Sequence, residues 1–356
     1  MNNIDRLREG LRERGLDAVL VTGEKDQRFV AGFPFTDGAV LVTKERAFLV
    51  TDSRYFEAAS RAVDSAVTVV MYDRAKPLAQ WLRALAVGES VRRLGAQEDS
   101  LSHSRFVEWE RALGLQLEPA GELLRALRGA KTEQEIALMR QAQEISERAL
   151  EEALALIRPG MTERELMAEL VYRMLRHGSE GNSFDPIVVA GARTSMPHGV
   201  PGDNVIRAGD FVTMDFGCIK GGYCSDMTRT VAVGKPSDEM INVYDTVLRA
   251  QLAGIAAARA GIPGRDIDDA ARRVIAEGGF GEHFGHGFGH GLGLDIHEPP
   301  NANPSGDTPM PEGAVCSAEP GIYLPGRFGV RIEDVMVLRR WGAELITRAP
   351  KTLLVL

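Results

Sequence analysis

Apolar residues recur at helical spacing along a segment near the middle of the chain. Between residues 131 and 157 they occupy positions 136, 138, 139, 142, 145, 149, 150, 153, 154 and 157. This spacing places them on one face of an amphipathic helix. Thr132 and Glu135 have the separation of a capping box, so we expect the helix to begin there.

The pattern before this helix is different, because short runs rich in Val and Leu alternate with amphipathic segments. DAVLVTG and GAVLVTKERAFLVTD have the composition of strands, and residues 4–16, 53–64 and 76–86 have helical patterns. Alternating strands and helices are typical of an α/β domain with a mostly parallel or mixed sheet. We predict this domain over residues 1–125.

The remaining chain, residues 126–356, groups its helices and strands instead of alternating them regularly. A second capping box at Thr162 and Glu165 predicts another helix, which ends near His177. Strands are expected at 184–190, 211–233 and 314–356, and helices at 237–260 and 264–278. This order predicts an α+β domain.

Composition narrows the classes of function. The chain has 356 residues, of which 44% are hydrophobic and 26% charged, and its formal net charge is -8. An acidic chain is a poor partner for nucleic acid or an anionic membrane, and no apolar run approaches the roughly 18 residues of a membrane span. The amphipathic N-terminus lacks a signal peptide's apolar segment, and three cysteines without a CxxC motif suit a reducing compartment. We therefore expect a cytoplasmic protein.

Two aspartates lie in a predicted β-hairpin, FVTMDFGCIKGGYCSDMTRTVAV. If Lys220 and Gly221 form the turn, Asp215 lies directly opposite Asp226. If Gly221 and Gly222 form it, the two aspartates are diagonal but remain on one face. Like charges so close destabilise a strand pair unless a cation compensates them; the alternative is that both face water.

Further acids occur in strand-like apolar settings downstream. Glu319 lies in AVCSAEPGIYL and Glu333 in GVRIEDVMVL, where an outward position or a salt bridge to Arg331 is the alternative to a binding role. His290 lies in the glycine-rich stretch GHGFGHGLGLDIHEPP. Together the four carboxylates and one imidazole form a donor set that suits two manganese or cobalt ions better than zinc. Such a pair of ions can activate water and polarise a carbonyl.

An ordered series of motifs resembles the pita-bread metallopeptidases, the family of methionine aminopeptidase, aminopeptidase P and prolidase. The motifs are SFDPIVVAGARTSMPHG, MDFG with YCSDMTRT, GHGLGLDIHEPP, SAEPGIY and VRIEDVMVL. The resemblance implies a pita-bread fold for the catalytic domain and a creatinase-like fold for the first 125 residues. An extra N-terminal domain of this kind favours the proline-specific branch, Xaa-Pro aminopeptidase P or prolidase.

The resemblance also implies roles for individual residues. His198 and His297 correspond to outer histidines that steady the substrate, and Glu319 also shuttles a proton. His286 corresponds to a position four residues before a ligand, and a structural hydrogen bond is the favoured interpretation of it. The five expected metal ligands are Asp215, Asp226, His290, Glu319 and Glu333.

The predicted function is hydrolysis of the X–Pro bond at the N-terminus of small peptides by an aminopeptidase P. Prolidase, which cleaves dipeptides, is the alternative. A metal-free hydrolase such as creatinase and a non-catalytic interaction protein are further alternatives, and both would be expected to have lost ligands. The expected cofactors are two divalent ions, Mn²⁺ with Co²⁺ or Zn²⁺ as alternatives, and the expected assembly is a homodimer that binds neither nucleic acid nor membrane.

Overall fold

The computed structural model describes residues 2–73 and 75–356. The chain divides into two compact units, one ending at Arg128 and the other comprising Gly129–Leu356. Within the described residues, no helix is long and apolar enough to cross a membrane.

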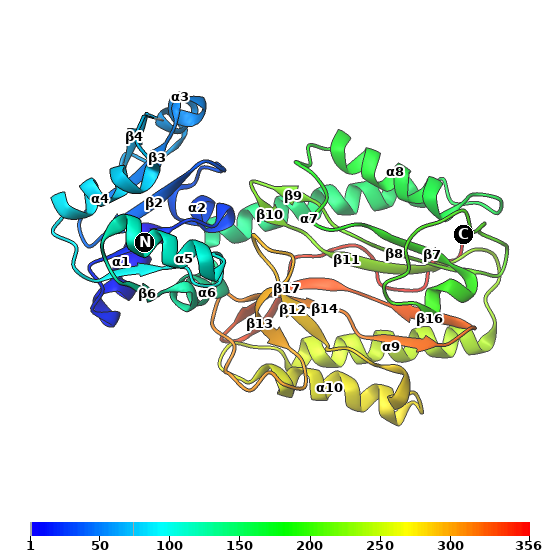
Figure 1. The fold of residues 1–356 in the computed structure, drawn as a ribbon. Helices are drawn as coiled ribbons and strands as arrows, with labels where there is room; N and C mark the ends of the chain where they lie inside the picture. The colour runs from blue at the N-terminus through cyan, green and yellow to red at the C-terminus, as the bar shows by residue number, and fades with distance from the viewer. Residues whose placement is uncertain (1, 74) are drawn as a thin grey trace. The chain divides into compact units, whose positions relative to one another are not determined.

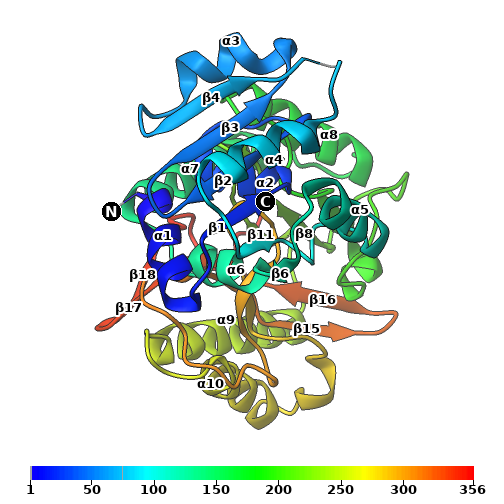
Figure 2. The same ribbon diagram turned by 60° about the vertical axis from the view of Figure 1, so that its left-hand side comes forward.

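The described residues of the first unit form a mixed sheet of six strands in the order β4-β3-β2-β1-β5-β6. Figure 2 shows β1 to β4 side by side in this order. Strand β2 pairs antiparallel with both neighbours, and the outer pairs are parallel. The strands are β1 (Ala18–Val21), β2 (Gly38–Thr43), β3 (Ala47–Thr51), β4 (Val67–Met71), β5 (Leu94–Ala96) and β6 (Leu117–Pro119).

Helices connect these strands, as the alternating pattern predicts, except that β3 follows β2 through a short turn. Strands β1, β2 and β3 are almost wholly buried, which explains their continuous apolar runs. The sequence patterns did not indicate α2, α5 or α6. The helices are α1 (Asn3–Arg14), α2 (Glu24–Ala31), α3 (Ser53–Ala62), α4 (Leu78–Gly88), α5 (His103–Leu113) and α6 (Gly121–Gly129).

In the second unit, two helix pairs enclose the sheets (Figure 1). Helices α7 (Glu133–Leu154) and α8 (Glu163–Arg176) lie on one side, and α9 (Asp238–Ala257) and α10 (Gly264–Glu277) lie on the other. Both predicted capping boxes are formed, at Thr132 with Glu135 and at Thr162 with Glu165. Short 3₁₀ helices occur at η1 (Gly191–Ser195) and η2 (Gly281–His283).

Two buried clusters of apolar side chains hold these layers together. One joins α7 and α8 to a three-stranded sheet, β11-β8-β7. The other joins α9 and α10 to a five-stranded sheet, β13-β12-β14-β17-β18, and to the β15-β16 ribbon. The strands are β7 (Ile187–Ala190), β8 (Phe211–Phe216), β9 (Ile219–Lys220), β10 (Tyr223–Cys224), β11 (Met227–Ala232), β12 (Gly289–Gly291), β13 (Glu298–Ala302), β14 (Val315–Ala318), β15 (Gly321–Leu324), β16 (Phe328–Arg331), β17 (Asp334–Arg339) and β18 (Gly342–Leu345).

The register of the central hairpin distinguishes the two turns that the sequence left open. Lys220 pairs with Tyr223, so Gly221 and Gly222 form the turn. Both glycines have positive φ, +58° and +81°, as a two-residue type I′ turn requires. Asp215 therefore pairs with Thr228, and Asp226 is its diagonal neighbour.

Candidate active site

One cavity in the second unit collects every site residue expected from the sequence. It has a volume of about 1260 Å³ and is lined by His198, Asp215, Asp226, His290, His297, Glu319 and Glu333. These residues come from separate segments: the loop after η1, strands β8 and β12, and the connections next to β11, β13, β14 and β17. The fold thus brings together side chains that are far apart along the chain.

Strand alternation explains why an acid can lie on the otherwise apolar strand β8. Val212, Met214 and Phe216 belong to the core under α7 and α8. Successive side chains of a strand point to opposite faces, so Asp215 faces away from that core and lines the cavity.

The tightest cluster contains Asp226, His290 and Glu333, each of which offers one ligand atom within 4.8 Å of the others. The Nε2 atom of His290 lies 3.5 Å from Asp226 Oδ2 and 3.2 Å from Glu319 Oε1. The other ring nitrogen, Nδ1, donates to the carbonyl of Gly291 at 3.2 Å. Because a carbonyl only accepts, Nδ1 carries a proton, and Nε2 is the ring nitrogen that faces the carboxylates.

Three carboxylates of this cavity each have an oxygen without a hydrogen-bond partner in the protein. One oxygen each of Asp215, Asp226 and Glu333 is buried and makes no hydrogen bond. The second oxygen is held in two of them: Thr228 Oγ1 donates to Glu333 Oε2 at 2.7 Å, and Arg331 donates to Asp215 Oδ2. A buried carboxylate oxygen without a partner is unfavourable unless a cation satisfies it. The donor set therefore fits divalent ions.

The electrostatics of the cluster reflect its crowding. Burial, and then the neighbouring Asp215 carboxylate, raise the pKa of Asp226 well above its usual range. Burial and the carboxylate of Asp226 raise the pKa of Glu333 in the same way. Burial acts against ionisation of His290 and Glu319 too, but their mutual hydrogen bond prevails, raising the pKa of His290 to about 9 and lowering that of Glu319 to about 2.

Besides His290, three histidines line the cavity, and they differ in their surroundings. His198 and His297 line the cavity, and the ring of His297 lies edge-on to that of His290 with centroids 4.3 Å apart. His286 also lines the cavity, but both its ring nitrogens have protein partners. Its Nδ1 donates to the Gly287 carbonyl at 2.9 Å, and its Nε2 accepts from the Tyr323 hydroxyl at 2.9 Å. This arrangement corresponds to the structural interpretation of His286.

Sequence reasoning did not identify the partners of Arg331. We expected that a salt bridge of Arg331, if it formed one, would involve Glu333, two residues away on the same strand face. Instead Arg331 reaches Asp215 and donates to the Tyr323 hydroxyl at 2.8 Å. The role of Tyr323 was also missed, because nothing in SAEPGIY distinguishes a hydrogen-bonding tyrosine from a packed one.

Comparison with known proteins identifies the family of this site. The profile of Metallopeptidase family M24 matches residues 137–340, and the Creatinase/Prolidase N-terminal domain matches residues 3–129. The chain belongs to metallopeptidase family M24. It is therefore a hydrolase, and membership implies that it works with divalent metal ions. The resemblance found in the sequence is confirmed.

Solved structures of family members resemble the whole chain. A structure described as Xaa-Pro dipeptidase from Bacillus anthracis superposes with a TM-score of 0.94 at 42% identity, covering 99% of both chains. One described as X-Pro aminopeptidase from Thermotoga maritima MSB8 has a TM-score of 0.92 at 38% identity, covering 97% of this chain and 99% of that one. The Xaa-Pro dipeptidase of Pyrococcus horikoshii is 34% identical over 353 residues, 99% of this chain and 98% of the relative. The creatinase-like N-terminal domain and the pita-bread catalytic domain expected from the sequence are confirmed.

Proposed function

We propose that this M24 enzyme is an Xaa-Pro aminopeptidase that removes the first residue of peptides with proline in second position. The observation that carries this proposal is the convergence of His198, His297 and the carboxylate cluster on one cavity with unpartnered buried oxygens. A non-catalytic protein or a metal-free hydrolase would have no reason to keep this complete donor set.

Asp215, Asp226, His290, Glu319 and Glu333 would hold two divalent ions. When bound, such ions activate water and polarise the carbonyl of the scissile bond. Manganese is our choice, because the set offers carboxylate oxygens and only one imidazole nitrogen.

The chain's own side chains perform the remaining steps. His198 and His297 line the cavity and would donate hydrogen bonds to the carbonyl oxygen as negative charge develops on it. Glu319 would accept a proton and return it to the leaving nitrogen. Its Oε1 also accepts from Ser317 Oγ at 3.0 Å, which orients the carboxylate toward His290.

Specificity for proline is supported by the names of the relatives and by chemistry. An X–Pro bond has no N–H, and proline fixes φ near -65°, so binding of the substrate as an added strand is poor. A dedicated cavity solves this problem. Apolar side chains supply much of its wall: Met167, Val171, Leu175, Phe184, Pro186 and Ile187.

The positively charged side chains that line the cavity favour an aminopeptidase over a dipeptidase. A dipeptidase must bind the free carboxylate of its substrate, which calls for a positive group. Arg331 is the only lysine or arginine among the residues that line this cavity of the second unit, which the structure describes in full. Its Nε, Nη1 and Nη2 atoms already donate to Thr228, to Tyr323 and the Pro197 carbonyl, and to Asp215.

The test compares an X–Pro dipeptide with the matching X–Pro–X tripeptide, using protein loaded with Mn²⁺. We expect a higher kcat/KM for the tripeptide. A higher value for the dipeptide would favour prolidase, the activity named for two of the relatives above. Metal analysis after dialysis is the parallel measurement, and protein that retains no metal and shows no hydrolysis would contradict the proposal.

The proposal also covers the cellular location and the oligomeric state of the enzyme. All three cysteines, Cys218, Cys224 and Cys316, are buried free thiols, which supports a cytoplasmic location. The homodimer implied by the resemblance remains part of the proposal, and size-exclusion chromatography with light scattering would test it.

A further inference from the structure

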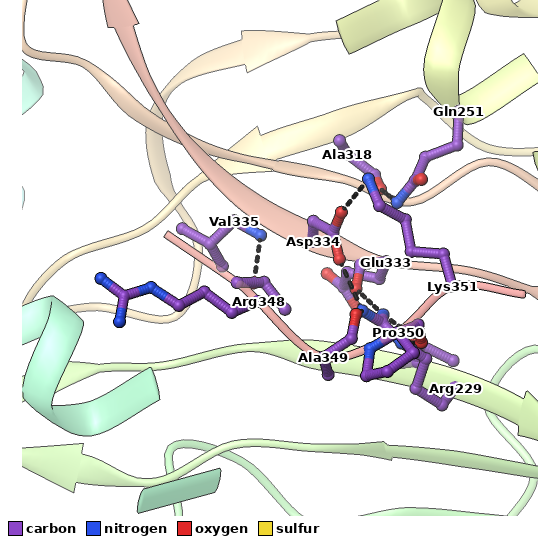
Figure 3. A network of polar contacts seen from close by, with 12 residues as sticks. Arg229, Gln251, Ala318, Glu333, Asp334, Val335, Arg348, Ala349, Pro350 and Lys351 are labelled. Atoms are coloured by element: carbon purple, nitrogen blue, oxygen red, sulfur yellow. Dashed lines mark hydrogen bonds and ion pairs between the residues drawn. The ribbon is translucent and has the colours of Figure 1, made fainter. Parts of the chain in front are cut away.

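Arg229 is a buried arginine behind the cavity, and its hydrogen-bonding capacity is completely used (Figure 3). Nε donates to the Pro350 carbonyl at 2.9 Å. Nη1 donates to the carbonyls of Thr228 at 2.9 Å and Glu333 at 2.5 Å. Nη2 donates to Asp334 Oδ1 at 2.8 Å and to the Ala349 carbonyl at 2.7 Å. These contacts match the five N–H donors of a guanidinium.

The position of Arg229 relates it directly to two of the proposed metal ligands. It lies on β11, which begins after Asp226, and it holds the backbone of Glu333, which precedes β17. Strand alternation points Thr228 and Arg229 to opposite faces. Thr228 holds the Glu333 carboxylate on the cavity side at 2.7 Å, while Arg229 holds the Glu333 carbonyl from behind.

The C-terminal tail completes this arrangement. Lys351 Nζ lies 2.5 Å from Asp334 Oδ2, so the buried Asp334 carboxylate is shared between two cations. The Lys351 carbonyl accepts from the Tyr244 hydroxyl at 2.8 Å. Residues 349–351 therefore lie against the strand that follows Glu333, held from both sides.

We propose that Arg229, together with Asp334 and the tail segment 349–351, is a positioning device for the metal centre that fixes Glu333 relative to Asp226. This inference rests on the proposed metal site. Lysine cannot substitute, because an ammonium has three donors and no planar fork that could reach four carbonyls and a carboxylate. Groups that orient metal ligands without touching the metal typically change metal affinity by about 10–100-fold when mutated.

The experiment titrates metal-free protein with Mn²⁺ alone and follows the free-ion EPR signal. Arg229→Lys is compared with wild type and with Arg339→Lys. Arg339 is a matched control on β17 that pairs with Glu133 and Glu344. We expect Arg229→Lys to bind Mn²⁺ about 10–100-fold more weakly. Arg339→Lys should bind like wild type. Circular dichroism verifies that each variant is folded.

The outcomes separate the two proposals. If wild-type protein binds no Mn²⁺, the proposed metal site itself fails. If wild type binds Mn²⁺ and folded Arg229→Lys binds it with equal affinity, the positioning role is overturned. If Arg229→Lys does not fold, Lys351→Met decides, since it removes only the second cation of Asp334. A weaker Mn²⁺ affinity in Lys351→Met supports the device, and an unchanged affinity overturns it.

Discussion

Arg331 donates a charge-assisted hydrogen bond to Asp215, 116 positions earlier in the chain. Both side chains are largely buried, with exposed fractions of 4% and 12%. The bond leaves the other Asp215 oxygen, Oδ1, without a protein partner. One oxygen of this proposed ligand is therefore oriented by the protein while the other remains available to a cation.

Arg331→Met should strongly destabilise the metal-free protein. The substitution leaves the Asp215 carboxylate buried without its positively charged side-chain partner. Removing one partner of a buried ion pair lowers the free energy of unfolding by about 3–5 kcal/mol. Added Mn²⁺ should restore part of this stability, because it supplies a positive charge to the same carboxylate. Thermal unfolding with and without Mn²⁺ measures both effects. Arg327→Met, which removes a half-exposed partner of Glu239, is the control and should change little. Equal melting temperatures for the two variants would contradict the prediction.

Asp226→Ala should abolish turnover and leave the fold intact. The carboxylate lies in a cluster of like charges, so its removal relieves repulsion in the metal-free protein instead of creating a new unfavourable contact. Release of the N-terminal residue from an X–Pro–X tripeptide, with excess Mn²⁺, measures turnover, and circular dichroism measures folding. Asp269→Ala, at an exposed position of α10, should retain wild-type activity. Wild-type turnover in Asp226→Ala would refute the assignment of this residue as a ligand.

His297→Ala should lower kcat at least tenfold while metal is retained. The imidazole lines the cavity beside His290 but lies outside the tight cluster of Asp226, His290 and Glu333. Loss of one donor to a developing oxyanion lowers turnover on the order of 100-fold. Release of the N-terminal residue from an X–Pro–X tripeptide gives kcat, and elemental analysis gives the metal content. His103→Ala, at an exposed position of the first unit, is the control. A variant with unchanged kcat would remove His297 from the catalytic machinery.

Asp17→Asn should destabilise the protein at neutral pH but much less in acid. A hydrogen bond from Lys44, and then those from the backbone amides of Arg93 and Arg92, lower the pKa of Asp17 to about 2 from its usual 3.8. The carboxylate therefore contributes stability that is fully present above about pH 4 and is lost as the pH falls toward 2. Because Asp17 is partly exposed, solvent screens these interactions, and we expect the free energy of unfolding to fall by about 1 kcal/mol at pH 7. Denaturant unfolding should show a smaller difference in stability between wild type and Asp17→Asn at pH 3 than at pH 7. A difference that grows in acid would contradict the account.

The sequence by itself determined the features that depend on neighbours along the chain. The capping boxes at Thr132 and Thr162 form because each involves residues three positions apart, so no tertiary contact is needed to place the helix starts. The ordered motifs identified the family and named the residues that line the cavity, since those side chains are specified by chemistry rather than by packing.

Only the tertiary structure decided between alternatives that local patterns allow equally. Two turns were compatible with KGGY, and the paired strands selected Gly221 and Gly222. Arg331 could reach Glu333 on its own strand face. In the folded protein, however, β8 lies in contact with β16, and Arg331 pairs with Asp215 of β8 instead. The partners of Arg229 lie as far as 121 positions away. Contacts at such separations depend on how the strands and the C-terminal tail are brought together, and neither periodicity nor motif spacing contains that information.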